Sequence, residues 1–100
     1  MDNYEVKLSP EAVRNLERIY DHIATHLLEL GIAERMIERL EQGILSLKRM
    51  PERNPVRQTG IYAGQGYRQL FVKKYVIVYR VLREKKEVHI ITVRYAPSQF

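Results

Sequence analysis

The sequence predicts a two-layer α+β domain in which an antiparallel helical hairpin packs on a four-stranded, mainly antiparallel sheet. Two amphipathic segments between residues 10 and 50 predict the hairpin, because apolar residues recur there at helical spacing. One alternating run before them and three runs rich in Val, Ile, Tyr and Phe after them predict the strands. The order β-α-α-β-β-β implies that the sheet buries the apolar stripes of the helices. We expect a single domain over residues 1–100.

The first strand and the first helix are expected to meet at residue 9. Residues 4–8 alternate between apolar and polar side chains, as in a half-buried strand. Ser9 and Pro10 then supply a helix N-cap and a proline at the first helical position. Gly31 predicts the end of this helix. Its apolar stripe comprises Val13, Leu16, Ile19, Tyr20, Ile23, Ala24 and Leu27.

The second helix is expected to begin near Ile32 and to end at Pro51. Gly43 lies in its middle, where glycine costs about 1 kcal/mol relative to alanine, so we expect close packing at that point. Few residues separate the two helices, which predicts an antiparallel pair. Its stripe comprises Ala33, Met36, Ile37, Leu40, Ile44 and Leu47. The core between helices and sheet is expected to contain Leu16, Ile23, Met36, Leu40, Ile77 and Tyr79.

A long loop and a three-stranded meander follow the hairpin. Residues 51–66 contain two prolines and three glycines without sustained periodicity, and loops of this length are often functional. Residues 67–95 predict three antiparallel strands with turns at residues 73–74 and 83–87. In the middle strand, alternation directs one set toward the core, namely Tyr75, Ile77, Tyr79 and Val81. The opposite set comprises Val76, Val78 and Arg80.

Charge is distributed unevenly along the chain. Residues 1–50 carry 7 Lys/Arg and 9 Asp/Glu, whereas residues 51–100 carry 10 Lys/Arg and 3 Asp/Glu. The basic half is typical of proteins with a phosphate-rich or acidic partner, although exposed strand edges also carry lysine for solubility. The chain has no cysteine and no apolar run long enough to span a membrane. We therefore expect a cytoplasmic protein without disulfides.

Candidate functional residues are basic and aromatic. His22 and His26 lack a third ligand at metal-binding spacing, and the glycines match no phosphate-binding fingerprint, so no metal or cofactor is expected. A ribonuclease that uses a 2′-hydroxyl as nucleophile needs cations near the phosphate and a group that transfers a proton. The candidates for those roles are Arg68, Arg80, His89, Arg94 and Tyr95. Candidates for binding a target or nucleic acid are Arg53, Arg57, Lys73, Lys74 and Phe100.

Each of these residues also has a structural interpretation. Lys73 and Lys74 lie at a predicted turn, where lysine is usually solvated. His89 in an apolar strand is often a buried imidazole with its hydrogen bonds satisfied. Arginine is uncommon inside strands without a partner, so Arg68, Arg80 and Arg94 carry the strongest functional signal.

Several segments resemble the RelE/ParE superfamily of bacterial toxins. They are Ser9-Pro-Glu-Ala12, Ile19-Tyr-Asp-His-Ile23, residues 40–53, Gly66-Tyr-Arg68, Tyr75-Val-Ile-Val-Tyr-Arg-Val81 and His89-Ile-Ile-Thr-Val-Arg94. The resemblance covers nearly the whole chain and agrees with the expected order of elements. It implies the toxin of a type II toxin–antitoxin system, which a small cognate antitoxin neutralises in a heteromeric complex.

The resemblance implies two possible targets. RelE-like members cut messenger RNA in the ribosomal A site, whereas ParE-like members poison DNA gyrase and generally lack the catalytic set. This chain has Val76 where RelE-like ribonucleases often keep an arginine, and Ala96 where some place a histidine. The long helical hairpin also resembles ParE. A gyrase-directed toxin is therefore favoured; the alternatives are a metal-independent, ribosome-dependent endoribonuclease and a small RNA-binding module without toxicity.

Overall fold

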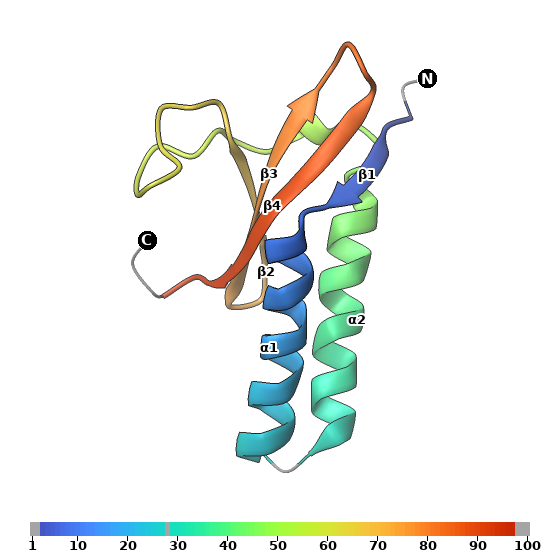
Figure 1. Cartoon of the computed structure of the whole chain (residues 1–100), viewed down its shortest axis with the longest axis vertical. Helices are drawn as coiled ribbons and strands as arrows, with labels where there is room; N and C mark the ends of the chain where they lie inside the picture. Colours follow the sequence, from blue (N-terminus) through green and yellow to red (C-terminus); the bar gives the residue numbers. More distant parts are fainter. Residues whose placement is uncertain (1–2, 28, 98–100) are drawn as a thin grey trace.

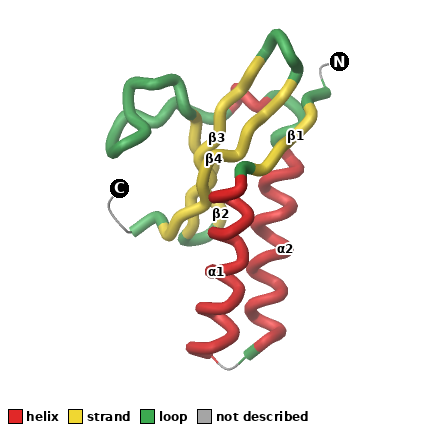
Figure 2. Tube along the Cα trace, viewed as in Figure 1, coloured by secondary structure: helices red, strands yellow, loops and turns green. Residues whose placement is uncertain are grey.

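In the computed structural model, a helical hairpin lies against one face of a four-stranded sheet (Figure 1). The structure describes residues 3–27 and 29–97. The elements in chain order are β1 (Glu5–Leu8), α1 (Pro10–Leu27), α2 (Leu30–Ser46), the 3-10 helix η1 (Pro51–Arg53), β2 (Arg68–Val72), β3 (Tyr75–Leu82) and β4 (Glu87–Tyr95). Helices and strands form two separate layers, and the hairpin extends beyond the sheet (Figure 2). This arrangement confirms the predicted α+β fold.

The sheet has the order β1-β4-β3-β2. The pairs β2–β3 and β3–β4 are antiparallel, as predicted, and β1 pairs with β4 in parallel. A parallel pair needs a crossover connection, and here the whole segment from α1 to β3 supplies it. β1 begins at Glu5, one residue later than the predicted strand, which began at Tyr4.

The start of α1 follows the sequence signals. The Ser9 hydroxyl accepts a hydrogen bond from the Ala12 backbone N–H at 3.0 Å, as an N-cap residue does, and donates one to the Ile91 carbonyl at 2.7 Å. The Ser9 backbone N–H also donates to the Ile90 carbonyl at 3.0 Å. The first turn of α1 is therefore attached to the edge of β4.

The predicted bounds of α2 were wrong at both ends. The helix begins at Leu30, two residues early, because the Glu29 side chain caps it by accepting a hydrogen bond from the Gly31 N–H at 3.0 Å. Gly31 is therefore in the first turn of α2 and does not end α1. At the other end the helix stops at Ser46, and Pro51 begins the separate 3-10 helix η1. Met50, with φ 47°, lies in the left-handed region between the two helices.

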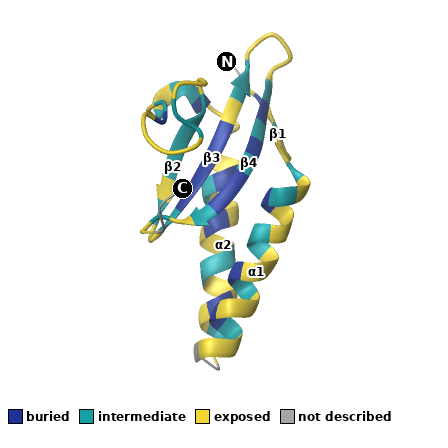
Figure 3. Ribbon diagram, turned by 60° about the vertical axis from the view of Figure 1, so that its left-hand side comes forward, coloured by how far each residue is buried: buried dark blue, intermediate teal, exposed yellow. Residues whose placement is uncertain are grey.

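The core lies between the hairpin and the sheet, as predicted (Figure 3). Leu40, Ile77 and Tyr79 are fully buried and Ile23 nearly so, while Leu16 and Met36 are partly buried against them. Val13 was expected in the stripe of α1 but is 45% exposed. The side chain of Leu27 lies outside the described part of the structure.

Gly43 explains how closely α2 approaches the sheet. A Cβ atom at this position would lie 2.8 Å from Cγ2 of Val72 and 3.6 Å from Cδ1 of Ile77. The first distance is too short for any side chain unless Val72 shifts. The predicted close packing at Gly43 is therefore confirmed.

A β-bulge in β4 was not predicted, and it decides which side chains share a face. Val78 pairs with Thr92 and Tyr79 pairs with Ile90, so Ile91 is an extra residue in β4. The bulge reverses the alternation after it. In consequence His89 and Arg94, an odd and an even position, both belong to the face that the hairpin does not cover.

Candidate functional site

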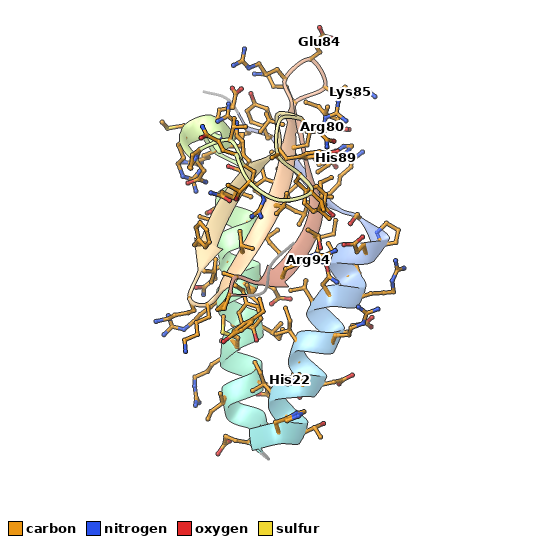
Figure 4. The ribbon with its side chains drawn as sticks, turned by 90° about the vertical axis from the view of Figure 1, so that its left-hand side faces the viewer. His22, Arg80, Glu84, Lys85, His89 and Arg94 are labelled. Carbon is orange, nitrogen blue, oxygen red and sulfur yellow. The ribbon has the colours of Figure 1, made fainter. Side chains whose placement is uncertain are left out.

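The five candidate catalytic residues are divided between the two faces of the sheet. Arg68 pairs with Tyr79 across β2 and β3, which places it on the side of the sheet that faces the hairpin. Tyr95 pairs with Tyr75 and belongs to the same side. The opposite side, which we call the open face, carries the cross-strand pair of Arg80 and His89 and also Arg94 (Figure 4). Strand pairing therefore does not bring the five together.

Arg68 takes part in a network that attaches η1 and the following loop to the sheet. Its guanidinium donates to the backbone carbonyls of Glu52 at 3.2 Å and Asn54 at 2.7 Å, and it lies 3.8 Å from the Glu52 carboxylate. Arg83 binds both carboxylate oxygens of Glu52, at 2.9 and 2.8 Å. This contact lowers the pKa of Glu52 below its ordinary value. Arg68, Arg83 and Glu52 therefore hold η1 and the start of the loop against the sheet.

Tyr79 completes this network from the core. Its hydroxyl donates to the Pro51 carbonyl and accepts from the Asn54 side-chain amide at 3.1 Å. Burial raises the pKa of Tyr79, so its hydroxyl remains protonated and available as a donor. The predicted core position of Tyr79 is correct, and its polar group is satisfied by the loop.

The two arginines in the loop are bound within the fold. One Nη atom of Arg53 donates to the carbonyls of Ser46, Arg49 and Met50 and the other to the Ser46 hydroxyl, at 2.7–3.4 Å, which closes the C-terminal end of α2. Arg57 is 8% exposed, and its guanidinium donates to the Gln69 side chain at 3.2 Å. Both residues were candidates for target binding. The structure places both in contacts that hold the loop.

On the open face, a carboxylate holds His89. Nε2 of His89 lies 2.9 Å from the Glu87 carboxylate, and Nζ of Lys7 lies 2.9 Å from the same group. Hydrogen bonds first from Lys7 and then from His89 lower the pKa of Glu87 to about 2. The His89 side chain is 38% exposed, so the interpretation as a buried imidazole was wrong, although the ring has a partner. Arg80 is exposed, and within the described ranges no residue forms a hydrogen bond or ion pair with it.

Arg94 lies at the other end of the open face, where β4 meets α1. Its guanidinium is 3.5 Å from the Glu11 carboxylate and 3.3 Å from the Thr92 hydroxyl. Arg94 pairs with Val76, four positions from Arg80 along β3, which corresponds to roughly 13 Å of strand. A single phosphate therefore cannot lie close to the backbone of both Arg80 and Arg94. The two arginines could bind the same phosphate only if both side chains extended toward it.

The remaining candidates lie near the end of the sheet. Lys73 and Lys74 form the turn between β2 and β3, as predicted, and Lys73 has a positive φ of 54°. Tyr95 is 45% exposed, and its ring lies edge-on to that of Tyr75, with centroids 5.8 Å apart. Phe100 lies outside the described residues. No group of three or more His, Asp or Glu residues that could hold a metal occurs within residues 3–27 and 29–97.

The acidic partners of these residues were not predicted from the sequence. Glu87 and His89 are two positions apart on one strand, so period-two alternation could have predicted that their side chains meet. Glu52 offered no such signal, since its partners Arg68 and Arg83 come from distant parts of the chain. None of the described helices is long and apolar enough to cross a membrane.

Comparison with known proteins identifies the family. Residues 6–99 match the profile of the ParE toxin of the type II toxin–antitoxin system parDE. A solved chain of the chromosomal ParDE system from P. aeruginosa superposes with a TM-score of 0.77 at 20% identity, over 95% of this chain and 98% of that one.

RelBE proteins share the fold as well. A chain of the RelBE2 toxin–antitoxin complex from Mycobacterium tuberculosis gives a TM-score of 0.69 at 20% identity, over 93% of this chain and 98% of that one. A chain of the E. coli RelBE complex gives a TM-score of 0.60 at 18% identity, over 93% of this chain and 96% of that one. A search of curated proteins found no match. Because the family profile covers nearly the whole sequence, the chain belongs to the ParE toxin family of type II toxin–antitoxin systems, within the RelE/ParE superfamily.

Proposed function

We propose that this toxin inhibits growth by binding DNA gyrase and that it does not cleave RNA. The observation that carries the proposal is the division of the candidate catalytic residues between the two faces of the sheet. Cleavage of RNA by attack of a 2′-hydroxyl on phosphorus, with the 5′-oxygen leaving, requires a cation and a proton-transfer group within hydrogen-bond reach of the same phosphate. Arg68 and Tyr95 lie on one side and Arg80, His89 and Arg94 on the other, so of the five candidates only Arg80 and His89 remain as a neighbouring cation and proton-transfer group. Membership of the ParE family supports the same conclusion.

The engagement of the arginines adds to this argument. Arg68 is bound to two carbonyls and close to Glu52, and Arg94 is close to Glu11. An arginine that stabilises a transition state would have to leave these partners, and that would cost part of the binding energy gained at the phosphate. A surface that recognises a protein target has no such requirement. The geometry therefore favours binding over catalysis.

The alternative function is a ribosome-dependent messenger-RNA endonuclease, and one observation favours it. Arg80 is exposed beside His89, and Glu87 holds the imidazole at 2.9 Å. A cation next to an oriented imidazole is a minimal arrangement for acid–base cleavage of RNA. This pair is the place where catalysis would occur if the protein has any.

The test is to express the toxin without its antitoxin and to measure both activities. We expect purified protein to inhibit supercoiling by gyrase and to trap gyrase on cleaved DNA, with a DNA-damage response in cells. Ribosome-bound messenger RNA should remain intact in a primer-extension assay. Cuts in the ribosomal A site that disappear in Arg80→Ala, while Arg35→Ala on the outer face of α2 still cuts, would establish the alternative instead.

We also propose that a cognate antitoxin neutralises the protein by wrapping its basic half. Several similar solved chains come from toxin–antitoxin complexes, and residues 51–100 carry 10 Lys/Arg against 3 Asp/Glu. An acidic segment that folds on binding suits such a surface. Its affinity should fall as salt rises from about 0.05 to 0.5 M, because surface charge attraction is screened over that range. Calorimetry at both concentrations measures this, and an unchanged affinity would contradict charge-based recognition.

A further inference from the structure

A groove runs between α1 and the end of the β3–β4 pair, and neither gyrase binding nor the Arg80–His89 alternative assigns it a role. Two adjoining hollows of about 510 and 490 Å³ form it, and they share Arg18 and Tyr95. Ile19, His22 and Tyr75 line the rest of the first hollow, and Glu11, Arg14, Asn15 and Arg94 line the rest of the second. In Figure 4, Arg94 lies where the sheet meets α1, and His22 lies farther along the helix.

The helical wall of the groove is one continuous stripe of α1. Glu11, Arg14, Arg18 and His22 recur at intervals of three or four residues, so they lie on the same side of the helix. From Glu11 to His22 the wall is roughly 16 Å long, at 1.5 Å per residue. That length suits an extended ligand of a few units better than a compact small molecule.

The groove is positively charged. Arg14 and Arg18 are exposed, and in the part of the chain that the structure describes neither forms a hydrogen bond or ion pair. Arg94 adds a third guanidinium, and Glu11, at 3.5 Å from it, is the acid that lines the hollows. The excess of cations over acids favours an anionic ligand. Arg14 and Arg18 are one helical turn apart, a separation that successive phosphates of an extended strand can span.

One end of the groove is aromatic. The ring of Tyr95 is 45% exposed and stands edge-on to that of Tyr75, and Ile19 lies beside them. A flat, partly exposed ring next to arginines is the usual platform for an unstacked base, whose π-face every nucleotide offers. An acidic peptide could use the arginines, but it gains little from an aromatic platform.

We propose that this groove binds a single strand of nucleic acid. Arg14 and Arg18 contact successive phosphates, a base stacks on Tyr95, and Arg94 adds positive charge beside Glu11. DNA and RNA share this chemistry, so the groove could engage a melted strand at the gyrase target or a strand of RNA. The site is separate from Arg80 and His89 and does not depend on which target the toxin has.

The test is fluorescence anisotropy with purified toxin and labelled 12-nucleotide strands of DNA and RNA and a duplex of the same sequence. The double variant Arg14→Ala/Arg18→Ala should weaken single-strand binding at least tenfold at about 50 mM salt. The slope of log K against log salt should become shallower by about 1.4, because each lost phosphate contact removes about 0.7 from it. The matched control is Arg35→Ala/Arg39→Ala, which removes two exposed arginines at the same spacing from α2 and should change binding less than twofold.

A second variant tests the aromatic platform. Tyr95→Leu keeps an apolar side chain and should weaken binding about five- to fifty-fold without changing the salt dependence, because stacking is not a charge interaction. Circular dichroism verifies that each variant is folded. If Arg14→Ala/Arg18→Ala does not fold, the single variant Arg18→Gln is used in its place.

Three results would overturn the proposal. They are no single-strand binding by the wild type at about 50 mM salt, equal weakening by the two double variants, and duplex binding as tight as single-strand binding. An acidic peptide that binds where oligonucleotides do not would assign the groove to a protein partner. The relative affinities of the DNA and RNA strands indicate which nucleic acid is the ligand. Gyrase inhibition is measured separately, so this test and that of the proposed function can fail independently.

Discussion

The two faces of the sheet differ in how their polar groups are satisfied. On the side of the hairpin, the Tyr79 hydroxyl and the Arg68 guanidinium each contact the loop that follows α2. On the open face, Arg80 is exposed and the His89 side chain is 38% exposed, although Glu87 holds its ring. The first face uses polar groups to attach a loop to the core. The second face also contacts the loop, through Arg57 and Gln69, and its Val76 and Val78 are buried, but it leaves Arg80 exposed.

Two arginines on neighbouring strands make the difference concrete. Arg68 on β2 and Arg80 on β3 have the same side chain and similar backbone, but they project to opposite sides of the sheet. Alternation predicted the side of Arg80, but nothing in the sequence around Arg68 indicated that the loop would bind its guanidinium. The contrast teaches that a basic strand residue is a functional candidate only after its neighbours across the sheet are known.

The largest effect is expected from the layer between hairpin and sheet. Leu40 is fully buried there, so Leu40→Ala should lower the free energy of unfolding by about 2–5 kcal/mol. Leu45, also on α2, is 53% exposed, and Leu45→Ala should change it by less than about 0.5 kcal/mol. Urea denaturation of both variants measures the difference. Similar losses in the two would mean that this face of α2 does not form the core.

The next effect separates the two arginines. Arg68→Ala removes hydrogen bonds to the Glu52 and Asn54 carbonyls and should cost about 1–3 kcal/mol. Arg80→Ala removes an exposed side chain and should cost less than about 0.5 kcal/mol. Thermal and urea denaturation of both variants in the same buffer measure the two losses of stability. If Arg80→Ala were the more destabilising, the division of roles between the faces would be wrong.

Much of the fold could be predicted because local patterns decide it. Alternation in β3 identified Ile77 and Tyr79 as core residues, and Ser9 marked the start of α1. The failures share a physical cause, which is that a tertiary or side-chain contact overrode a local signal. Gly31 did not end α1 because Glu29 caps the next helix. The bulge at Ile91 could not be predicted, since nothing in the composition of β4 distinguishes it.

The candidate site was harder to predict than the fold. Arg53 and Arg57 were predicted site residues because they are basic and lie in a long loop, but both are bound to groups within the fold. Conversely, Arg14 and Arg18 were not among the predicted site residues. Their proposed role depends on Tyr95, about 80 positions away in sequence, which only the fold brings beside them.

The smallest effect concerns the ionic contacts of the open face. Lys7 first and then His89 lower the pKa of Glu87 from 4.5 to about 2. A carboxyl with a lowered pKa in the folded state contributes stability above its unfolded pKa and loses it as the pH falls. The contribution of Glu87 should therefore be complete above about pH 5 and disappear toward pH 2. Glu87→Gln should flatten this part of the stability curve.

Denaturation series between pH 5 and pH 2 measure the effect. Glu52 also has a lowered pKa, but it titrates in wild type and variant alike, so the difference between the two curves reports Glu87 alone. Glu84→Gln, an exposed acid in the turn before β4, is the matched control and should follow the wild type. Raising the salt concentration should shrink the difference, because screening weakens exposed ion pairs. Parallel curves for wild type and Glu87→Gln would show that Lys7 and His89 do not hold this carboxylate in solution.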